Sequence, residues 1–164
     1  MVDVFSQSVQ QRFWSKVIKQ DSERGHWFWI GAIADDGYGR LSINARGRTD
    51  SVRPHRFAYA LAHGRELNTL GPLMHTCDIP ICVRATTDEL THLVEGTVLD
   101  NMLDRRQKGR ASNGQQFAWR GLPRQRFTEK SRALRDELTT HGTTRPDVLA
   151  ALITGNDPEA PTLF

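Results

Sequence analysis

The sequence predicts an α+β fold with small antiparallel β elements and helices towards both ends. Residues 8–19 carry apolar side chains at helical spacing, and residues 128–154 return to the same period. Between them, residues 27–53 hold three short strand-like runs separated by turn residues. The chain has 164 residues, of which 38% are hydrophobic and 25% charged, so it is long enough to bury one core of its own.

The first half of the chain is expected to contain a helix, a three-stranded antiparallel meander and a second helix. The first helix is amphipathic, with Phe13 on its apolar side. Turn residues ending at Gly37 separate the first two strands, and Pro54 opens the second helix, which Gly64 ends. The expected elements are a helix over 8–19, strands over 27–32, 38–44 and 48–53, and a helix over 54–63.

The second half is expected to be a short strand followed by helices. Thr97 with Asp100 three residues later is typical of a capping box, which predicts the start of a helix. We divide the chain into a main domain, residues 1–110, and a linker with a helical extension, residues 111–164, for DNA binding or dimerisation. A hairpin of the last two helices is favoured over a helix-turn-helix, since no clear recognition helix follows. The expected elements are a strand over 72–76, a helix over 97–108, a surface arm over 108–123, and helices over 128–140 and 144–154.

The basic residues are mostly arginines, although the net charge is only +3. Eighteen arginines stand against four lysines, and the planar guanidinium suits phosphates and base edges. An ordinary solvated charged face is the alternative for any single run. The cations that we expect to contact DNA cluster in two segments: Arg40, Arg46, Arg48, Arg53 and Arg56, and then Arg105, Arg106, Lys108 and Arg110.

Several protein classes are disfavoured by composition. Two cysteines are too few for a disulfide-stapled scaffold. No apolar run approaches the roughly 20 residues that span a bilayer, and the first residues do not resemble a secretion signal. We therefore expect a cytoplasmic protein, of a bacterium or a phage-infected cell, with no membrane partner.

The cysteines are instead notable for the histidines around them. Cys77 and Cys82 lie five residues apart, His75 precedes them by two, and His92 follows by ten. Taken alone, this spacing is also compatible with two buried or loosely paired thiols.

The wider segment HTCDIPICVRATTDELTHLVEGTVLDNMLDRRQKGR resembles the metal-finger motif of HNH-type (His-Me finger) endonucleases. The closer resemblance is to the His-Cys box branch, which includes homing endonucleases and phage nucleases. Upstream, WIGAIADDGYGRLSI and RPHRFAYALAHG also resemble this family, so the likeness covers roughly residues 10–110. The matching positions are His75, Cys77, Cys82, His92, Gly96, Thr97, Asp100, Asn101 and Lys108–Arg110.

The resemblance implies a ββα-metal core stabilised by a structural zinc ion. Zinc takes four nitrogen or sulfur ligands in a tetrahedron. Cys77, Cys82 and His92 supply three, and His26 stands where the family usually has a cysteine. The alternative for His26 is a surface histidine. This chain departs from the family in its loop, where Arg84 replaces an asparagine and extra residues precede His92, so Asp88 or Glu89 is the alternative to His92 as a metal ligand.

The resemblance also implies catalytic roles. His75 would be the general base that takes a proton from water, with a buried or metal-proximal histidine as the alternative. Asn101 would bind a catalytic Mg²⁺ ion. An arginine would contact the scissile phosphate, with Arg40 the first choice and Arg53 and Arg56 its competitors. For His55 we expect packing or a phosphate contact.

The function implied is hydrolysis of double-stranded DNA by a metal-dependent endonuclease. One site cuts one strand, so cutting both strands would need a homodimer. A non-catalytic, zinc-stabilised DNA-binding module is the main alternative, because binding alone requires neither His75 nor Asn101. A nuclease directed at RNA, or a toxin-like nuclease with an inhibitor partner, is a third possibility.

Overall fold

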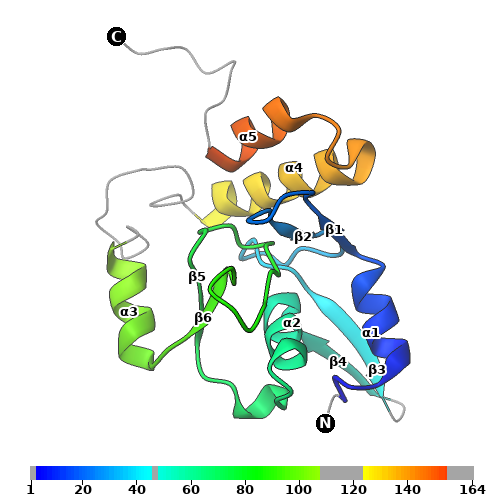
Figure 1. Cartoon of the computed structure of the whole chain (residues 1–164), viewed down its shortest axis with the longest axis vertical. Helices are drawn as coiled ribbons and strands as arrows, with labels where there is room; N and C mark the ends of the chain where they lie inside the picture. The colour runs from blue at the N-terminus through cyan, green and yellow to red at the C-terminus, as the bar shows by residue number, and fades with distance from the viewer. Residues whose placement is uncertain (1–2, 46–47, 108–123, 155–164) are drawn as a thin grey trace.

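The structure is a computed structural model that describes residues 3–45, 48–107 and 124–154. In this part of the chain, three two-stranded antiparallel sheets and five α-helices surround one core (Figure 1). The α+β class is therefore confirmed. The elements in chain order are α1 (Gln7–Trp14), β1 (Val17–Lys19), β2 (Trp27–Trp29), β3 (Leu41–Ala45), β4 (Arg48–Val52), α2 (Pro54–Ala62), the short 3₁₀ helix η1 (Leu67–Thr69), β5 (Leu73–His75), β6 (Leu93–Glu95), α3 (Val98–Gln107), α4 (Arg124–His141) and α5 (Pro146–Thr154).

The first helix is shorter than predicted. It ends at Trp14, and Val17 and Ile18 continue as strand β1, which pairs with β2 in antiparallel register. The expected helix over 8–19 is therefore wrong beyond residue 14. Both Val17 and Ile18 are β-branched, which favours extended backbone when a strand partner is available.

The predicted three-stranded meander is also wrong. β2 pairs with β1, while β3 and β4 form a separate hairpin in which Leu41 faces Val52. The segment between β2 and β3 folds back on itself: the Ala34 amide donates to the Tyr38 carbonyl at 2.8 Å. The two sides of this turn pair through an isolated bridge between Ile33 and Gly39, but in the described residues the pairing does not join β2 and β3 into one sheet.

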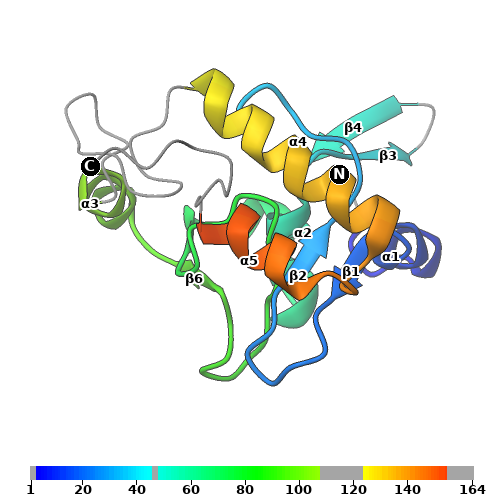
Figure 2. The same ribbon diagram turned by 90° about the horizontal axis from the view of Figure 1, so that it is seen from above.

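A hairpin followed by a helix lies on the side of the molecule opposite α1 (Figures 1 and 2). β5 and β6 pair antiparallel, with His75 opposite Leu93, and α3 contacts β5. The predicted capping box is confirmed: the Thr97 amide donates to the Asp100 carboxylate at 2.7 Å, and the Asp100 amide donates to Thr97 Oγ1 at 3.1 Å. Strand β6 was not predicted.

Aromatic residues from three elements form the centre of the core. The ring of Phe13 on α1 lies 4.8 Å from that of Phe57 on α2 and 5.8 Å from that of Trp29 on β2. All three side chains are fully buried. Their packing fixes the position of β2, the strand that begins directly after His26.

Helices α4 and α5 belong to the same core. Leu134 and Leu138 of α4 and Leu149 of α5 are almost completely buried, as expected for a helical hairpin packed on the main domain. Thr128 Oγ1 also donates to the Asp35 carbonyl at 2.8 Å, which ties α4 to the loop before β3. The two helices cover one side of β1 and β2 (Figure 2). No helix in the described ranges has both the length and the apolarity of a membrane span.

Candidate metal centre

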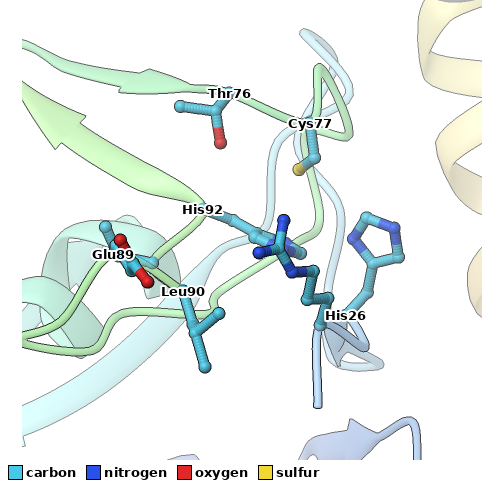
Figure 3. A pocket seen from close by; sticks show the side chains of 8 residues that line it. His26, Thr76, Cys77, Glu89, Leu90 and His92 are labelled. Carbon is cyan, nitrogen blue, oxygen red and sulfur yellow. The ribbon is translucent and has the colours of Figure 1, made fainter. Parts of the chain in front are cut away.

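Two histidines and two cysteines from distant parts of the sequence form a compact group. The ligand atoms of His26, Cys77, Cys82 and His92 all lie within 4.8 Å of one another. In Figure 3, the Cys77 sulfur and the rings of His26 and His92 face a common space. This is the set of four residues predicted from the sequence, and it can hold one metal ion.

Backbone pairing beside β2 places His26 next to Cys82. The Trp29 amide donates to the Ile81 carbonyl at 2.8 Å, and the Val83 amide donates to the Trp27 carbonyl at 2.7 Å. The residues around Cys82 therefore run beside β2 as an additional extended segment. Because His26 directly precedes β2, its side chain reaches the same end of this pairing.

The β5–β6 hairpin supplies the other two ligands. The Thr76 amide donates to the His92 carbonyl at 3.0 Å, so the pairing of the hairpin continues for one step beyond His75. Cys77 comes next. Asp78 then adopts a left-handed conformation with φ 61°, which aspartate tolerates better than most residues and which turns the chain back towards Cys82.

Arg84 holds the loops around the metal centre together, a role that the sequence did not reveal. Its side chain is 5% exposed and donates to the carbonyls of Glu23, Gly25 and Leu90, at 2.5–2.8 Å. Its own carbonyl accepts the His92 amide at 3.0 Å. The segment before His26 and the loop before His92 are therefore fixed to one guanidinium. The sequence signal was the arginine at a position where the HNH-type endonucleases that the segment resembles have an asparagine.

The electrostatics of the four side chains favour a cation. Within the described residues, His26 Nδ1 is buried without a hydrogen-bond partner. The pKa of Cys77 is lowered, chiefly by a hydrogen bond from the Cys82 thiol, while burial raises the pKa of Cys82. Two adjacent thiolates repel each other unless a positive charge lies between them. A metal ion would supply that charge and would also satisfy His26.

The centre opens onto a surface pocket of about 320 Å³. Glu89 lines this pocket but is outside the four-residue group, and Figure 3 shows it apart from His26 and Cys77. The Asp88 carboxylate accepts hydrogen bonds from Thr86 Oγ1 and the Leu90 amide, at 2.6 and 3.0 Å. His92, and neither Asp88 nor Glu89, therefore belongs to the four-residue group.

His75 lies directly beside this centre, at the end of β5. It is 3% exposed, and its Nε2 is 2.9 Å from the carbonyl oxygen of Cys82. Because a carbonyl only accepts, Nε2 carries the proton in this hydrogen bond, and Nδ1 is the basic nitrogen of the neutral ring. The rings of His55 and Tyr38 lie 5.0 and 5.9 Å from the His75 ring. Neither neighbour was predicted to be close to His75.

Asn101 lies in the first turns of α3 and is partly exposed. Its amide donates to the Thr97 carbonyl at 3.0 Å, so it belongs to the regular helix that the capping box begins. Since α3 contacts β5, the helix that carries Asn101 adjoins the strand that ends at His75.

The arginines predicted to contact DNA have different surroundings. Arg40 is exposed at the start of the β3–β4 hairpin, and Arg106 is exposed on α3. Arg53 donates to both carboxylate oxygens of Asp36, at 3.1 and 2.6 Å. Arg56 donates to three carbonyls between residues 67 and 71 and so holds the chain after α2. Arg46, Lys108 and Arg110 lie outside the described residues, as do the side chains of Arg48 and Arg105.

The fold and the four-residue group define an α+β protein with a candidate metal centre. Comparison with curated proteins gives two relatives from Escherichia phage T7. Protein 7.7 is 34% identical over 90 residues, which cover 55% of this chain and 62% of that protein. Protein 2.8 is 31% identical over 90 residues, 55% of each chain. The chain thus spans less than two thirds of either relative. No family model matches the chain, and no solved structure matches it.

Proposed function

We propose that this protein is a metal-dependent DNA endonuclease of the HNH (His-Me finger) type. The observation that carries the proposal is the position of His75. His75 is the last residue of β5, and its ring is hydrogen-bonded to the backbone of Cys82, a member of the four-residue group. Strand β6 and then helix α3, which carries Asn101, follow β5 in the chain. A strand–strand–helix unit braced by a metal centre, with a histidine at the strand end, is what the sequence resemblance implies.

Zinc is the metal that fits the four-residue group best. Two imidazoles and two thiols within 4.8 Å match the tetrahedral N₂S₂ set typical of structural zinc. All four positions are filled by protein, so the ion would have no open position for substrate. In this proposal zinc stabilises the loop between Cys77 and His92 and takes no part in the chemical step.

The chemical step belongs to His75. With Nε2 held by the Cys82 carbonyl, Nδ1 is the nitrogen that can take a proton. A water deprotonated there attacks the phosphorus atom of a DNA phosphodiester, and the bond from phosphorus to the 3′ oxygen breaks. That oxygen takes up a proton from solvent, so the products are a 5′-phosphate end and a 3′-hydroxyl end. Fixing the ring orientation in advance is how such a base becomes effective.

The second metal in the proposal is Mg²⁺, held by Asn101. Its amide oxygen is the kind of hard ligand that Mg²⁺ prefers, and a single protein ligand suits an ion that keeps several waters and binds substrate phosphates. When bound, Mg²⁺ supplies charge stabilisation for the departing 3′ oxygen. Asn101 is partly exposed, so its amide is accessible from the surface.

In this proposal, those arginines that were predicted to contact DNA and are exposed would bind the phosphates of the DNA backbone. Arg40 remains the first choice for the scissile phosphate, because it is exposed and lies two residues after Tyr38. The Tyr38 ring is 5.9 Å from the His75 ring. Arg53 would have to leave Asp36, and Arg56 would have to release three carbonyls. Losing those bonds makes both arginines weaker candidates.

Plasmid cleavage tests the proposal directly. Wild-type protein, His75→Ala and Asn101→Ala are incubated with supercoiled DNA and Mg²⁺, and the zinc content of each is measured. Removal of a general base costs about 10²- to 10⁴-fold in rate. We expect losses of that size in His75→Ala, a comparable loss in Asn101→Ala, and one zinc per chain in all three proteins. His63→Ala, at the exposed end of α2, serves as the matched histidine control.

The other outcomes separate the alternatives. Binding of DNA with no cleavage by the wild type would favour the non-catalytic DNA-binding module. Equal cleavage by all three proteins would remove His75 and Asn101 from the mechanism. Loss of zinc from His75→Ala would mean that this histidine is a ligand and not the base.

A further inference from the structure

His55 is a buried histidine that the proposed mechanism does not yet use. It is the second residue of α2 and is 8% exposed. Its Nδ1 is buried and has no hydrogen-bond partner among the residues that the structure describes. A buried polar atom without a partner costs free energy, and in native proteins it usually indicates a bound water, an ion or a functional role.

Among the described residues, no side chain caps the start of α2. The residue before the helix, Arg53, makes no side-chain capping bond, and Pro54 has no N–H to donate. The Phe57 amide is satisfied by the Arg53 carbonyl at 3.0 Å. The amides of His55 and Arg56 are thus the first-turn donors of a nine-residue helix, whose positive end favours an anion.

The groups around His55 reinforce this preference for negative charge. The rings of His75 and Tyr38 lie 5.0 and 5.6 Å away, and the Arg53 guanidinium lies 5.8 Å from the centre of the Tyr38 ring. The pKa of His55 is lowered well below its usual value, first by burial, and then by His75, Arg56 and Arg53. Burial is the main cause, and the charged groups that add to it are all basic, with Arg53 itself ion-paired to Asp36.

We propose that His55 binds the phosphate group on which His75 acts, by donating its Nδ1–H to a non-bridging phosphate oxygen. The ligand class is a phosphate monoester or diester, and in DNA it would be the scissile diester. This inference rests on the proposed nuclease function for the identity of the ligand. His55 touches the substrate in this proposal, beside the histidine that deprotonates the water, and the α2 amides supply further donors for the same anion.

Histidine side-chain NMR on the wild-type protein tests the contact. The ring nitrogens are recorded during titration with inorganic phosphate, and separately with a short DNA duplex in Ca²⁺, which replaces Mg²⁺ to slow cleavage. We expect the Nδ1 signal of His55 to shift in both titrations, and the signals of exposed His63, at the other end of α2, to stay unchanged. A shift with the duplex alone would mean that the site takes only the diester of DNA.

Substitution supplies the second measurement. His55→Phe keeps the ring and removes the donor, and His63→Phe is its matched control; zinc content shows whether each is folded. Loss of one hydrogen bond to a charged group predicts about a 10- to 100-fold drop in kcat/KM for His55→Phe. If that variant fails to fold, His55→Gln, which keeps a donor, is expected to retain more activity than His55→Ala.

The outcomes distinguish this inference from the proposed function. DNA cleavage at wild-type kcat/KM by folded His55→Phe, or an Nδ1 signal unmoved by both ligands, overturns the role of His55 and leaves the nuclease standing. A phosphate-induced shift at His55 in a protein that cuts no DNA supports the anion site and removes the nuclease.

Discussion

The Nε2 of His75 lies 2.9 Å from the carbonyl oxygen of Cys82, so the candidate base is hydrogen-bonded to the backbone of a candidate metal ligand. The segment around Cys82 is in turn paired with β2 and closed by Arg84. The orientation of the His75 ring therefore depends on how well ordered the loop between Cys77 and His92, the metal loop, is. In the proposed nuclease, a structural metal that contacts no substrate would control activity through this one hydrogen bond.

Removal of zinc should consequently abolish cleavage even when Mg²⁺ is abundant. The protein is stripped with a chelator, freed of it by gel filtration, and assayed with Mg²⁺ alone or with Mg²⁺ plus one equivalent of Zn²⁺. We expect cleavage at least about 100-fold below the starting rate with Mg²⁺ alone, the scale on which a general base contributes. Recovery with added Zn²⁺ is expected. Full activity of the stripped protein would show that His75 does not depend on the metal loop.

His26→Ala should lower both the zinc content and the stability. This substitution removes one of four ligands, so the free energy of metal binding that supports folding decreases. We expect fewer than one zinc per chain by elemental analysis, and a loss of about 2–4 kcal/mol in the free energy of unfolding, the scale of losing a buried paired group. His141→Ala, on α4 outside the group, is the control. An unchanged zinc stoichiometry would exclude His26 as a ligand.

The four-residue group could be predicted because the segment around it resembles the HNH-type metal-finger motif, in which residue types recur in a fixed order. His75, Cys77 and Cys82 lie within eight residues of one another, and the capping box marks the start of α3 without any tertiary information. His26 is more distant, but it stands directly before a strongly apolar strand. Signals of this kind can be read from the sequence because they depend on residues that are close together in the chain.

The errors concern pairing between segments, which local pattern does not determine. Val17 and Ile18 fit either the apolar side of a helix or a short strand, and only the presence of β2 decides between them. In the same way, Arg84 cannot be recognised as a brace until residues 23–25 are known to lie beside it. His55 and Tyr38 reach His75 through packing of α2 and a loop, for which the sequence carries no spacing rule.

Arg84→Met should destabilise the protein more than the loss of an exposed arginine would. The guanidinium is buried and satisfies three carbonyls, which would lose their donor in the variant. We expect a loss of about 2–4 kcal/mol in urea unfolding, since each unsatisfied buried acceptor costs on the order of 1 kcal/mol or more. Arg126→Met, at an exposed position of α4, should change stability by about 0.5 kcal/mol or less. Equal effects would show that Arg84 does not brace the metal loop.

Acidification should destabilise the protein partly through His55. Its pKa is lowered in the folded state by burial, His75, Arg56 and Arg53, whereas the unfolded chain titrates near 6.5. Below that pH the unfolded state binds a proton that the folded state rejects, so stability falls as pH falls, by at most about 1.4 kcal/mol per pH unit from this group.

The contribution of His55 can be isolated by comparing wild type with His55→Phe between pH 7 and pH 5. Protonation of the metal ligands affects both proteins, so the difference between their slopes reports the removed histidine. We expect a shallower slope for His55→Phe by chemical denaturation at each pH. Identical slopes would mean that His55 is not held neutral in the fold.

Gly37→Ala should weaken the attachment of α4 to the main domain. Gly37 has φ 81°, which alanine adopts only with strain, and a Cβ there would lie 2.6 Å from Cδ1 of Phe127. Phe127 packs on Tyr38, whose ring is a neighbour of His55 and His75, so a shift of α4 would reach the proposed active site. We expect a loss of about 1–3 kcal/mol in stability and lower cleavage at an unchanged zinc content. Gly64→Ala is a matched control, because Gly64 also has positive φ, at 61°, but its Cβ would meet nothing within 4 Å. If both variants lose the same stability and keep full activity, strain alone explains the effect, and α4 does not support the site.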